Sequence, residues 1–168
     1  MISDTIDTPL GPMKAMADDK GLCLLTFCDQ LATTRKDQKI ISSLNEATPE
    51  TTTRFLAQIK QELHAYFSGQ LTTFKTPLHL MGTAFQQSVW RELQKIPYGQ
   101  TCAYADIARA LGKPTAYRAV ANANGANPLG VIVPCHRVIS SDGSIGGYTG
   151  GIRLKRQLLA LEMGRTFS

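Results

Sequence analysis

Residues 131–139 have the sequence VIVPCHRVI and constrain the chain more than any other stretch. The β-branched residues predict a buried strand, which Pro134 ends because its nitrogen has no hydrogen to give a neighbouring strand. Cys135 follows at the predicted strand end, where a rigid element can direct a side chain into a pocket. His136 and Arg137 come next, and both residue types favour the thiolate form of a nearby cysteine. Cys135 is therefore a candidate nucleophile, although a buried structural cysteine explains these nine residues equally well.

The composition is that of a globular protein, with 43% hydrophobic and 18% charged residues in a chain of 168. No apolar run reaches the length of a membrane span, and the first residues lack the basic and apolar regions of a secretory signal. We therefore expect a cytoplasmic protein. Its four cysteines, Cys23, Cys28, Cys102 and Cys135, lack the spacing of a disulfide framework and are expected to stay thiols there, with Cys102 in a structural role.

The basic residues are concentrated in the second half of the chain. Residues 1–81 carry 8 Lys and Arg against 9 Asp and Glu, whereas residues 82–168 carry 10 against 4. The second half therefore has a net charge of +6, which favours a polyanionic partner. A basic face that serves only solubility is the alternative, because the excess is modest.

The first half predicts a small domain of strands and one helix. Residues 13–17 alternate between apolar and polar or small side chains, residues 18–21 form a turn, and residues 22–27 supply a second strand, which is typical of a hairpin. Residues 51–67 place apolar side chains at helical spacing. Residues 71–80 contain Pro77 and are interpreted as a connector, so we predict two domains, 1–81 and 82–168.

The second half opens with a helix whose capping box is formed by Thr83 and Gln86. Two short helices follow, at 104–111 and 115–123, separated by Gly112, Lys113 and Pro114. This order predicts a helix-turn-helix, although an ordinary helical hairpin has the same spacing.

The second helix of this pair carries little side-chain bulk, because alanines occupy much of it and Arg118 is expected to project from its middle. A helix of this kind brings its backbone close to a narrow groove. A helix that reads bases in the major groove is expected to carry several long hydrogen-bonding side chains. The pattern therefore favours sequence-independent binding. The alanines are Ala116, Ala119, Ala121 and Ala123.

Taken in order, these motifs resemble those of the O6-alkylguanine-DNA alkyltransferases (methylated-DNA–protein-cysteine methyltransferases). The resemblance is faint over residues 1–81, where Thr8-Pro9-Leu10-Gly11-Pro12 and the hairpin match, and close from Gly82 onward. It implies an α/β (α+β) fold with a small N-terminal sheet-and-helix (RNase H-like) domain and a C-terminal winged helix-turn-helix alkyltransferase domain. The matching residues are Gly82-Thr83, Phe85-Gln86, Ile96-Pro97, Gly99, Tyr104, Arg118-Ala119-Val120, Asn127-Pro128, Pro134-Cys135-His136-Arg137-Val138, Gly147-Tyr148 and Gly150-Gly151.

The family's chemistry is transfer of an alkyl group from O6 of guanine to a cysteine, which the resemblance identifies as Cys135. It implies that His136 is the base, acting through a bridging water, and that Glu162 orients the imidazole. Glu162 follows a helix predicted over 154–161, so only the fold can bring it to His136. Asn127 is expected to brace the turn that carries the cysteine, and Tyr104 to hydrogen-bond or protonate guanine N3. Each of these three residues also has a plainer interpretation. Glu162 would be a solvated carboxylate, Asn127 part of a simple Asn-Pro turn, and Tyr104 a helix-capping aromatic.

The resemblance also implies roles in substrate and DNA binding. The Val138 carbonyl is expected to accept from the exocyclic amine of guanine, while Tyr148 and Thr149 close over the base and donate to O6. Arg118 is expected to fill the space left by a nucleotide rotated out of the duplex. A phosphate contact is the plainer role for this arginine. Ala116, Tyr117 and Ala119 would lie against the minor groove of double-stranded DNA carrying O6-alkylguanine, although Tyr117 is large for that position.

The resemblance implies a monomer that needs no cofactor and no membrane. Some relatives hold zinc in the first domain, but Cys23, Cys28 and His64 lack ligand spacing here, so we predict no metal. Gly130 replaces a proline found beside the alkyl pocket in some members, so the sequence leaves open whether bulky adducts are accepted. It also leaves open the choice between O6-alkylguanine and O4-alkylthymine. A DNA-binding module without catalysis and a cysteine hydrolase or redox enzyme are the rival functions. The presence of Cys135 argues against the first, and the alanine-rich helix with Arg118 argues against the second.

Overall fold

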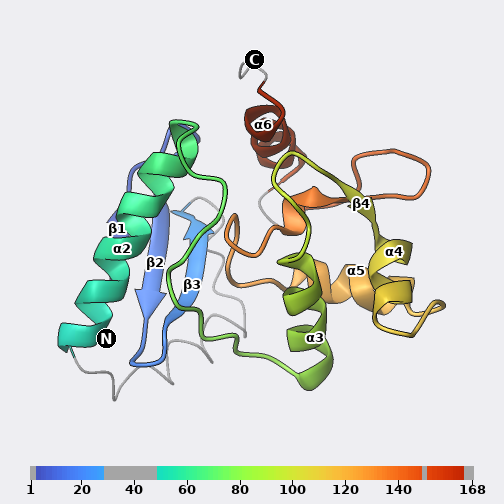
Figure 1. Cartoon of the computed structure of the whole chain (residues 1–168), viewed down its shortest axis with the longest axis horizontal. Coiled ribbons are helices and arrows are strands. Elements are labelled where there is room, and N and C mark those ends of the chain that lie inside the picture. Colours follow the sequence, from blue (N-terminus) through green and yellow to red (C-terminus); the bar gives the residue numbers. More distant parts are fainter. Residues whose placement is uncertain (1–2, 29–48, 149–150, 165–168) are drawn as a thin grey trace. The chain divides into compact units, whose positions relative to one another are not determined.

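A tight hairpin organises the first of the two units into which the chain divides, Met1–Met81 and Gly82–Ser168. The computed structural model describes residues 3–28, 49–148 and 151–164. In the first unit, strands β1 (Ser3–Ile6), β2 (Met13–Ala17) and β3 (Leu22–Phe27) form an antiparallel sheet in the order β1-β2-β3. Helix α2 (Pro49–Phe67) lies along one face of this sheet (Figure 1). The predicted hairpin and helix are both confirmed, and α2 begins two residues earlier because proline suits a first helical turn.

The turn between β2 and β3 is fixed by one carboxylate. Asp18 Oδ1 accepts hydrogen bonds from the backbone N–H groups of Lys20 and Gly21, at 2.8 and 3.1 Å. A Cβ at Gly21 would lie 2.6 Å from the carbonyl oxygen of Pro77, so only glycine fits there. The predicted connector pairs with β3 at this point, because Leu22 N donates to Pro77 O at 2.8 Å and His79 N to Leu22 O at 2.9 Å.

The second unit contains the helix-turn-helix. Its elements are α3 (Ala84–Leu93), β4 (Cys102–Ala103), α4 (Tyr104–Ala110), α5 (Tyr117–Gly125), β5 (Val138–Ile139) and α6 (Ile152–Glu162). In Figure 1, α6 lies above the parallel pair β4–β5, and α3, α4 and α5 lie below this pair. Thr83 and Gln86 form the predicted capping box at the start of α3. None of the helices in the described parts of the chain has the length and apolar character needed to cross a membrane.

The strand predicted before Pro134 is wrong. The apolar side chains of residues 131–133 are buried, but their backbone forms consecutive turns, in which Val133 N donates to Leu129 O at 3.0 Å. Val131 has φ of 71°, a left-handed value that is rare for a β-branched residue. A short apolar run shows that a segment is buried, and it does not show whether a neighbouring strand is present.

Helix α5 begins at Tyr117, two residues later than predicted. A tight turn comes first, in which Ala116 N donates to Lys113 O at 2.9 Å. Arg118 therefore lies in the first turn of α5 and not in its middle, and Ala116 precedes the helix. Pro114 disfavours the helical conformation for Lys113, the residue before it. The chain therefore makes a turn between α4 and α5 before the second helix begins.

Trp90 connects α3 to the last turn of α5. Its ring is 1% exposed, and its indole Nε1 donates to the carbonyl of Ala123 at 2.8 Å. Val89 and Leu93 on the same helix are also buried, so the apolar face of α3 packs against the helix-turn-helix and supports it.

We expect Trp90→Phe to lower the free energy of unfolding by about 2 kcal/mol, from one lost hydrogen bond and part of the ring packing. Urea denaturation followed by circular dichroism measures this, since the substitution removes the chain's one tryptophan and its fluorescence. Arg91→Ala, on the exposed side of α3, is the matched control and should change stability by less than about 0.5 kcal/mol. Equal losses in both variants would contradict the anchoring role.

Candidate active site

Cys135 begins a short 3-10 helix, Cys135–Arg137, that connects the turns after α5 to β5. The residue is 3% exposed and is not disulfide-bonded. Asn127 lies beneath this segment, with Nδ2 donating to Val133 O at 2.8 Å and Oδ1 accepting from Leu129 N at 2.9 Å. Asn124, which the sequence did not single out, donates to the carbonyl of Cys135 at 3.4 Å. Two amide side chains thus hold the backbone that carries the thiol.

The next two residues share one buried carboxylate. His136 Nε2 lies 2.7 Å from Glu162 Oε2, and both side chains are almost fully buried. Arg137 donates to both oxygens of the same carboxylate, from Nε at 2.7 Å and from Nη2 at 2.9 Å. Its Nη1 also donates to the carbonyl of Ile96 at 2.8 Å. Glu162 is the last residue of α6, so this helix delivers the carboxylate to the short helix of Cys135.

The imidazole of His136 is poised as a neutral base. Burial lowers its pKa below the ordinary value, and the hydrogen bond with Glu162 opposes that effect only in part. A neutral imidazole beside a carboxylate donates its Nε2–H to that carboxylate, which leaves the lone pair on Nδ1. Among the described residues, Nδ1 is buried without a hydrogen-bond partner. One ring nitrogen is therefore oriented by Glu162 and the other is ready to accept a proton.

Two tyrosines share the electrostatic environment of Cys135. Burial raises the pKa of Tyr104, and the charge of a Cys135 thiolate raises it further. The same two causes raise the pKa of Tyr148. The Tyr104 hydroxyl packs against Gly146, where a Cβ would lie 3.1 Å away. Both phenols therefore stay protonated and can donate hydrogen bonds, whereas Thr149 lies outside the described residues.

Lys155 is a site residue that the sequence reasoning missed. It is fully buried in α6, and its Nζ donates to the carbonyls of Val138 at 2.6 Å and Gly147 at 3.1 Å. The Val138 carbonyl is the one expected to accept from guanine. A signal was present in the sequence, because Lys155 and Glu162 are seven residues apart and so lie on one face of a helix.

A pocket of about 340 Å³ lies between α5 and the segment that follows β5. Such a volume is at the lower end of the range for small-ligand sites. Tyr104 belongs both to this pocket and to the surroundings of Cys135, although Cys135 itself is not part of the lining. Arg118 and Ala119 are exposed, Ala116 is half-buried and Tyr117 is 49% exposed. The lining residues are Tyr104, Ala105, Tyr117, Arg118, Ala121, Ser140 and Ser141.

The first unit brings together three side chains of metal-binding type, and they are not the set considered from sequence. Cys23 joins Asp18 and His79, with all three ligand atoms within 4.8 Å of one another. His79 Nδ1 is paired with Asp18 Oδ2 at 2.5 Å and lies 3.9 Å from Cys23 Sγ. Burial and the charge of Asp18 raise the pKa of Cys23 to about 12. The group is therefore a histidine–aspartate pair beside a protonated thiol, and the absence of a metal stays a prediction.

The fold and the site define a class of two-domain proteins, in which a small sheet-and-helix unit precedes a helix-turn-helix unit that carries a buried cysteine. Residues 1–80 match the ribonuclease-like domain of 6-O-methylguanine DNA methyltransferase, and residues 84–164 match its DNA binding domain. The chain belongs to the 6-O-methylguanine DNA methyltransferase family.

Individual relatives match over nearly the whole chain. A methylated-DNA–protein-cysteine methyltransferase of Methanosarcina barkeri is 44% identical over 162 residues, which cover 96% of this chain and 97% of the relative. A constitutive enzyme of the same name from Bacillus subtilis is 40% identical, over 94% of this chain and 93% of its own. The structure of Mycobacterium tuberculosis OGT in complex with DNA superposes with a TM-score of 0.81 at 40% identity, covering 98% of this chain and 94% of that one.

We expect the buried imidazole to make the protein less stable as the pH falls below about 6.5, the ordinary pKa of histidine. The folded-state pKa of His136 is lowered, so the unfolded chain takes up a proton that the folded chain refuses. Unfolding free energies from urea melts at about pH 7.5 and about pH 5 should therefore fall more steeply for the wild type than for His136→Gln. His64→Gln, at an exposed position of α2, should keep the wild-type slope. Equal slopes in all three proteins would refute the buried neutral imidazole.

Proposed function

We propose that this protein repairs DNA by transferring a methyl or other alkyl group from O6 of guanine to its own Cys135. The single observation that supports this most directly is the buried thiol followed at once by an imidazole whose far nitrogen is held by Glu162. Membership of the family supports the substrate class, and this arrangement supports Cys135 as the acceptor residue. The enzyme is a methylated-DNA–protein-cysteine S-methyltransferase.

The reaction begins with loss of the thiol proton. His136 Nδ1 takes this proton through a bridging water, while Glu162 stabilises the resulting imidazolium through the hydrogen bond at Nε2. The Cys135 thiolate then attacks the alkyl carbon in line with the C–O6 bond. A C–S bond forms, the C–O6 bond breaks, and the electron pair of that bond leaves with guanine. Tyr104 donates to guanine N3, which makes the base a better leaving group.

The remaining pocket residues select the base. The Val138 carbonyl accepts from the exocyclic amine of guanine, and Tyr148 and Thr149 close over the ring and donate to O6. A site that hydrogen-bonds a substrate amine rejects analogues without it, because the buried carbonyl is then left without that partner. Asn127 keeps the backbone around Cys135 in place through its bonds to Val133 and Leu129.

Helix α5 binds the minor groove of double-stranded DNA, largely without regard to sequence. The exposed Ala119 and the half-buried Ala116 allow close approach, and Tyr117 contacts the same groove. The alkylated guanine is rotated out of the stack, since a base inside the duplex cannot present O6 to a protein thiol. Arg118 fills the space that the base leaves, and it lines one pocket together with Tyr104.

The transfer is irreversible, because the alkyl group ends in a thioether and the chain offers no group that breaks a C–S bond. Each molecule therefore acts once. The reaction as proposed uses a thiolate, an imidazole and hydrogen-bond donors from the chain itself, without a cofactor. We also propose that the protein acts as a monomer in the cytoplasm, where a reducing environment keeps the acceptor thiol available.

Incubation with an oligonucleotide that contains O6-methylguanine should add the mass of one CH₂ group to the protein, on the peptide that contains Cys135. Cys135→Ser should abolish the transfer and preserve DNA binding. Cys102→Ser is the matched control and should react normally, since burial raises the pKa of that thiol to about 11 and keeps it protonated. Multiple turnovers without a modified cysteine would support a hydrolase instead.

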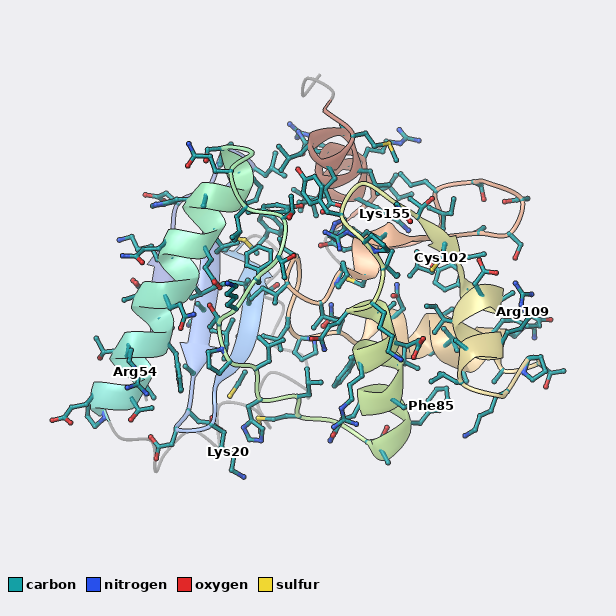
Figure 2. All side chains as sticks on the ribbon, viewed as in Figure 1. Lys20, Arg54, Phe85, Cys102, Arg109 and Lys155 are labelled. Carbon is teal, nitrogen blue, oxygen red and sulfur yellow. The ribbon has the colours of Figure 1, made fainter. Side chains whose placement is uncertain are left out.

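Arg118→Ala should slow repair of duplex DNA roughly tenfold more than reaction with the free alkylated base, because only the duplex requires extrusion. Single-turnover rates at saturating protein measure this, since saturation removes any effect that acts through affinity alone. Arg109, labelled in Figure 2, carries an exposed positive charge on α4. Arg109→Ala is the control and should repair duplex DNA at the wild-type rate once the protein is saturating. If Arg118→Ala also recovers at saturation, Arg118 binds phosphate and does not support extrusion.

A further inference from the structure

Lys155 is a buried ammonium group without a carboxylate partner. Its side chain is fully buried, and within the described parts of the chain no Asp or Glu lies within ion-pair distance of it. Its hydrogen bonds go to the carbonyls of Val138 and Gly147. Figure 2 shows Lys155 between α6 and the segment that contains β5. Lysine is almost never fully buried unless it is paired, so this position calls for a physical reason.

The first reason lies in the two carbonyls that Lys155 holds. Val138 belongs to β5, directly after the short helix of Cys135, and Gly147 lies in the loop next to Tyr148. A carbonyl oxygen has two lone pairs, so the Val138 oxygen can accept from Lys155 and from a substrate amine together. A charge-assisted hydrogen bond fixes such an oxygen more firmly than a neutral one does. Lys155 thus fixes the orientation of the group that is proposed to recognise guanine.

The second reason is the charge beside Cys135. Burial lowers the pKa of Lys155 and the charge of a Cys135 thiolate raises it, and together they bring this pKa to about 8. The interaction is reciprocal, so an ammonium at Lys155 favours the thiolate. The positive charge of Lys155 also contributes to the lowered pKa of His136. Of the other groups at this place, Tyr104 and Tyr148 are neutral, and Arg137 is paired with Glu162.

We infer that Lys155 is a positioning residue for alkyl transfer, which holds the Val138 carbonyl for the guanine amine and supplies the positive charge that favours the Cys135 thiolate. The inference rests on the proposed function, and it adds to that function the group that links base recognition to activation of the thiol. Lys155 acts through Val138 and Cys135 and transfers no proton itself.

The charge is tested with iodoacetamide, which reports on the thiolate without any guanine. The rate of carboxamidomethylation at Cys135 is followed by peptide mass spectrometry across a pH series. Lys155→Met should move the midpoint of this profile upward by about one pH unit, so the rate at neutral pH falls roughly tenfold. Arg153→Met removes an exposed charge from the same helix and should leave the midpoint unchanged. A lower rate with an unmoved midpoint in Lys155→Met would overturn the electrostatic role.

The positioning of the carbonyl is tested with two free bases, O6-methylguanine and O6-methylhypoxanthine, which lacks the exocyclic amine. The wild type should prefer the guanine, and Lys155→Met should lose at least tenfold of that preference. Lys155→Gln keeps an N–H donor without the charge, so it should retain most of the preference and still show the raised midpoint. An unchanged preference in Lys155→Met would overturn the positioning role. If the wild type methylates no cysteine at all, the proposed function fails and the positioning role fails with it, whereas the iodoacetamide profile still decides the electrostatic role.

A measurement without any substitution covers the case in which both variants fail to fold. The Nζ resonance of Lys155 in the wild type is titrated by NMR before and after Cys135 is capped with iodoacetamide. Capping removes the thiolate charge, so the pKa of Lys155 should fall. An unchanged pKa would show that the two groups do not interact and would overturn the electrostatic role.

Discussion

The buried carboxylate of Glu162 is the interaction on which the second unit depends. It accepts hydrogen bonds from His136 and from Arg137, and Arg137 continues to the carbonyl of Ile96. The end of α6, the short helix of Cys135 and the segment after α3 are thereby joined by charge-assisted bonds. Removing one member of such a buried pair destabilises a protein by about 3–5 kcal/mol, because the remaining charge is left without a partner. Glu162, which orients the imidazole of His136, therefore also stabilises the fold of the second unit.

The turns that precede Cys135 have an unusual backbone conformation, and neighbouring side chains hold them in it. Val131 has a left-handed φ, which costs about 1–3 kcal/mol for a residue other than glycine. Cys135 N donates to Val133 O at 2.7 Å, and Asn127 accepts from and donates to the same turns. Strain of this kind persists where the surroundings over-determine it. Here two buried amides and three buried apolar side chains do so, and the result is a thiol on a rigid turn.

Sequence reasoning succeeded where the determinants are local. The capping box of Thr83 and Gln86, the hairpin around Asp18 and the helix of the first unit depend on residues a few positions apart. It failed where the burial of a segment could be predicted but its backbone conformation could not. Residues 131–133 are buried as predicted, yet they form turns, and the start of α5 is displaced by a turn at Ala116.

The site itself divides in the same way. The Pro134–Arg137 motif is contiguous, so it marked Cys135 and His136 as candidates, and the family resemblance then favoured a nucleophile over a structural cysteine. The pairing with Glu162 spans 26 residues, and only the family resemblance suggested it. Lys155 escaped notice because a lysine on a surface helix is ordinarily solvated, and its burial depends on carbonyls from two other segments. Tertiary partners of this kind leave no local pattern beyond the shared helix face.

The same contacts change the explanation of how the thiolate is favoured. From the sequence, His136 and Arg137 were the expected sources of positive charge. In the structure Arg137 is neutralised by Glu162, and burial keeps His136 uncharged near neutral pH. Lys155 interacts with the charge of a Cys135 thiolate, and among the described residues no carboxylate lies within ion-pair distance of its ammonium group. On our proposal the His–Glu pair removes the thiol proton and Lys155 stabilises the anion that results. Only a neutral imidazole can accept the thiol proton, whereas a positive charge stabilises the thiolate. Proton removal and anion stabilisation therefore require two different side chains.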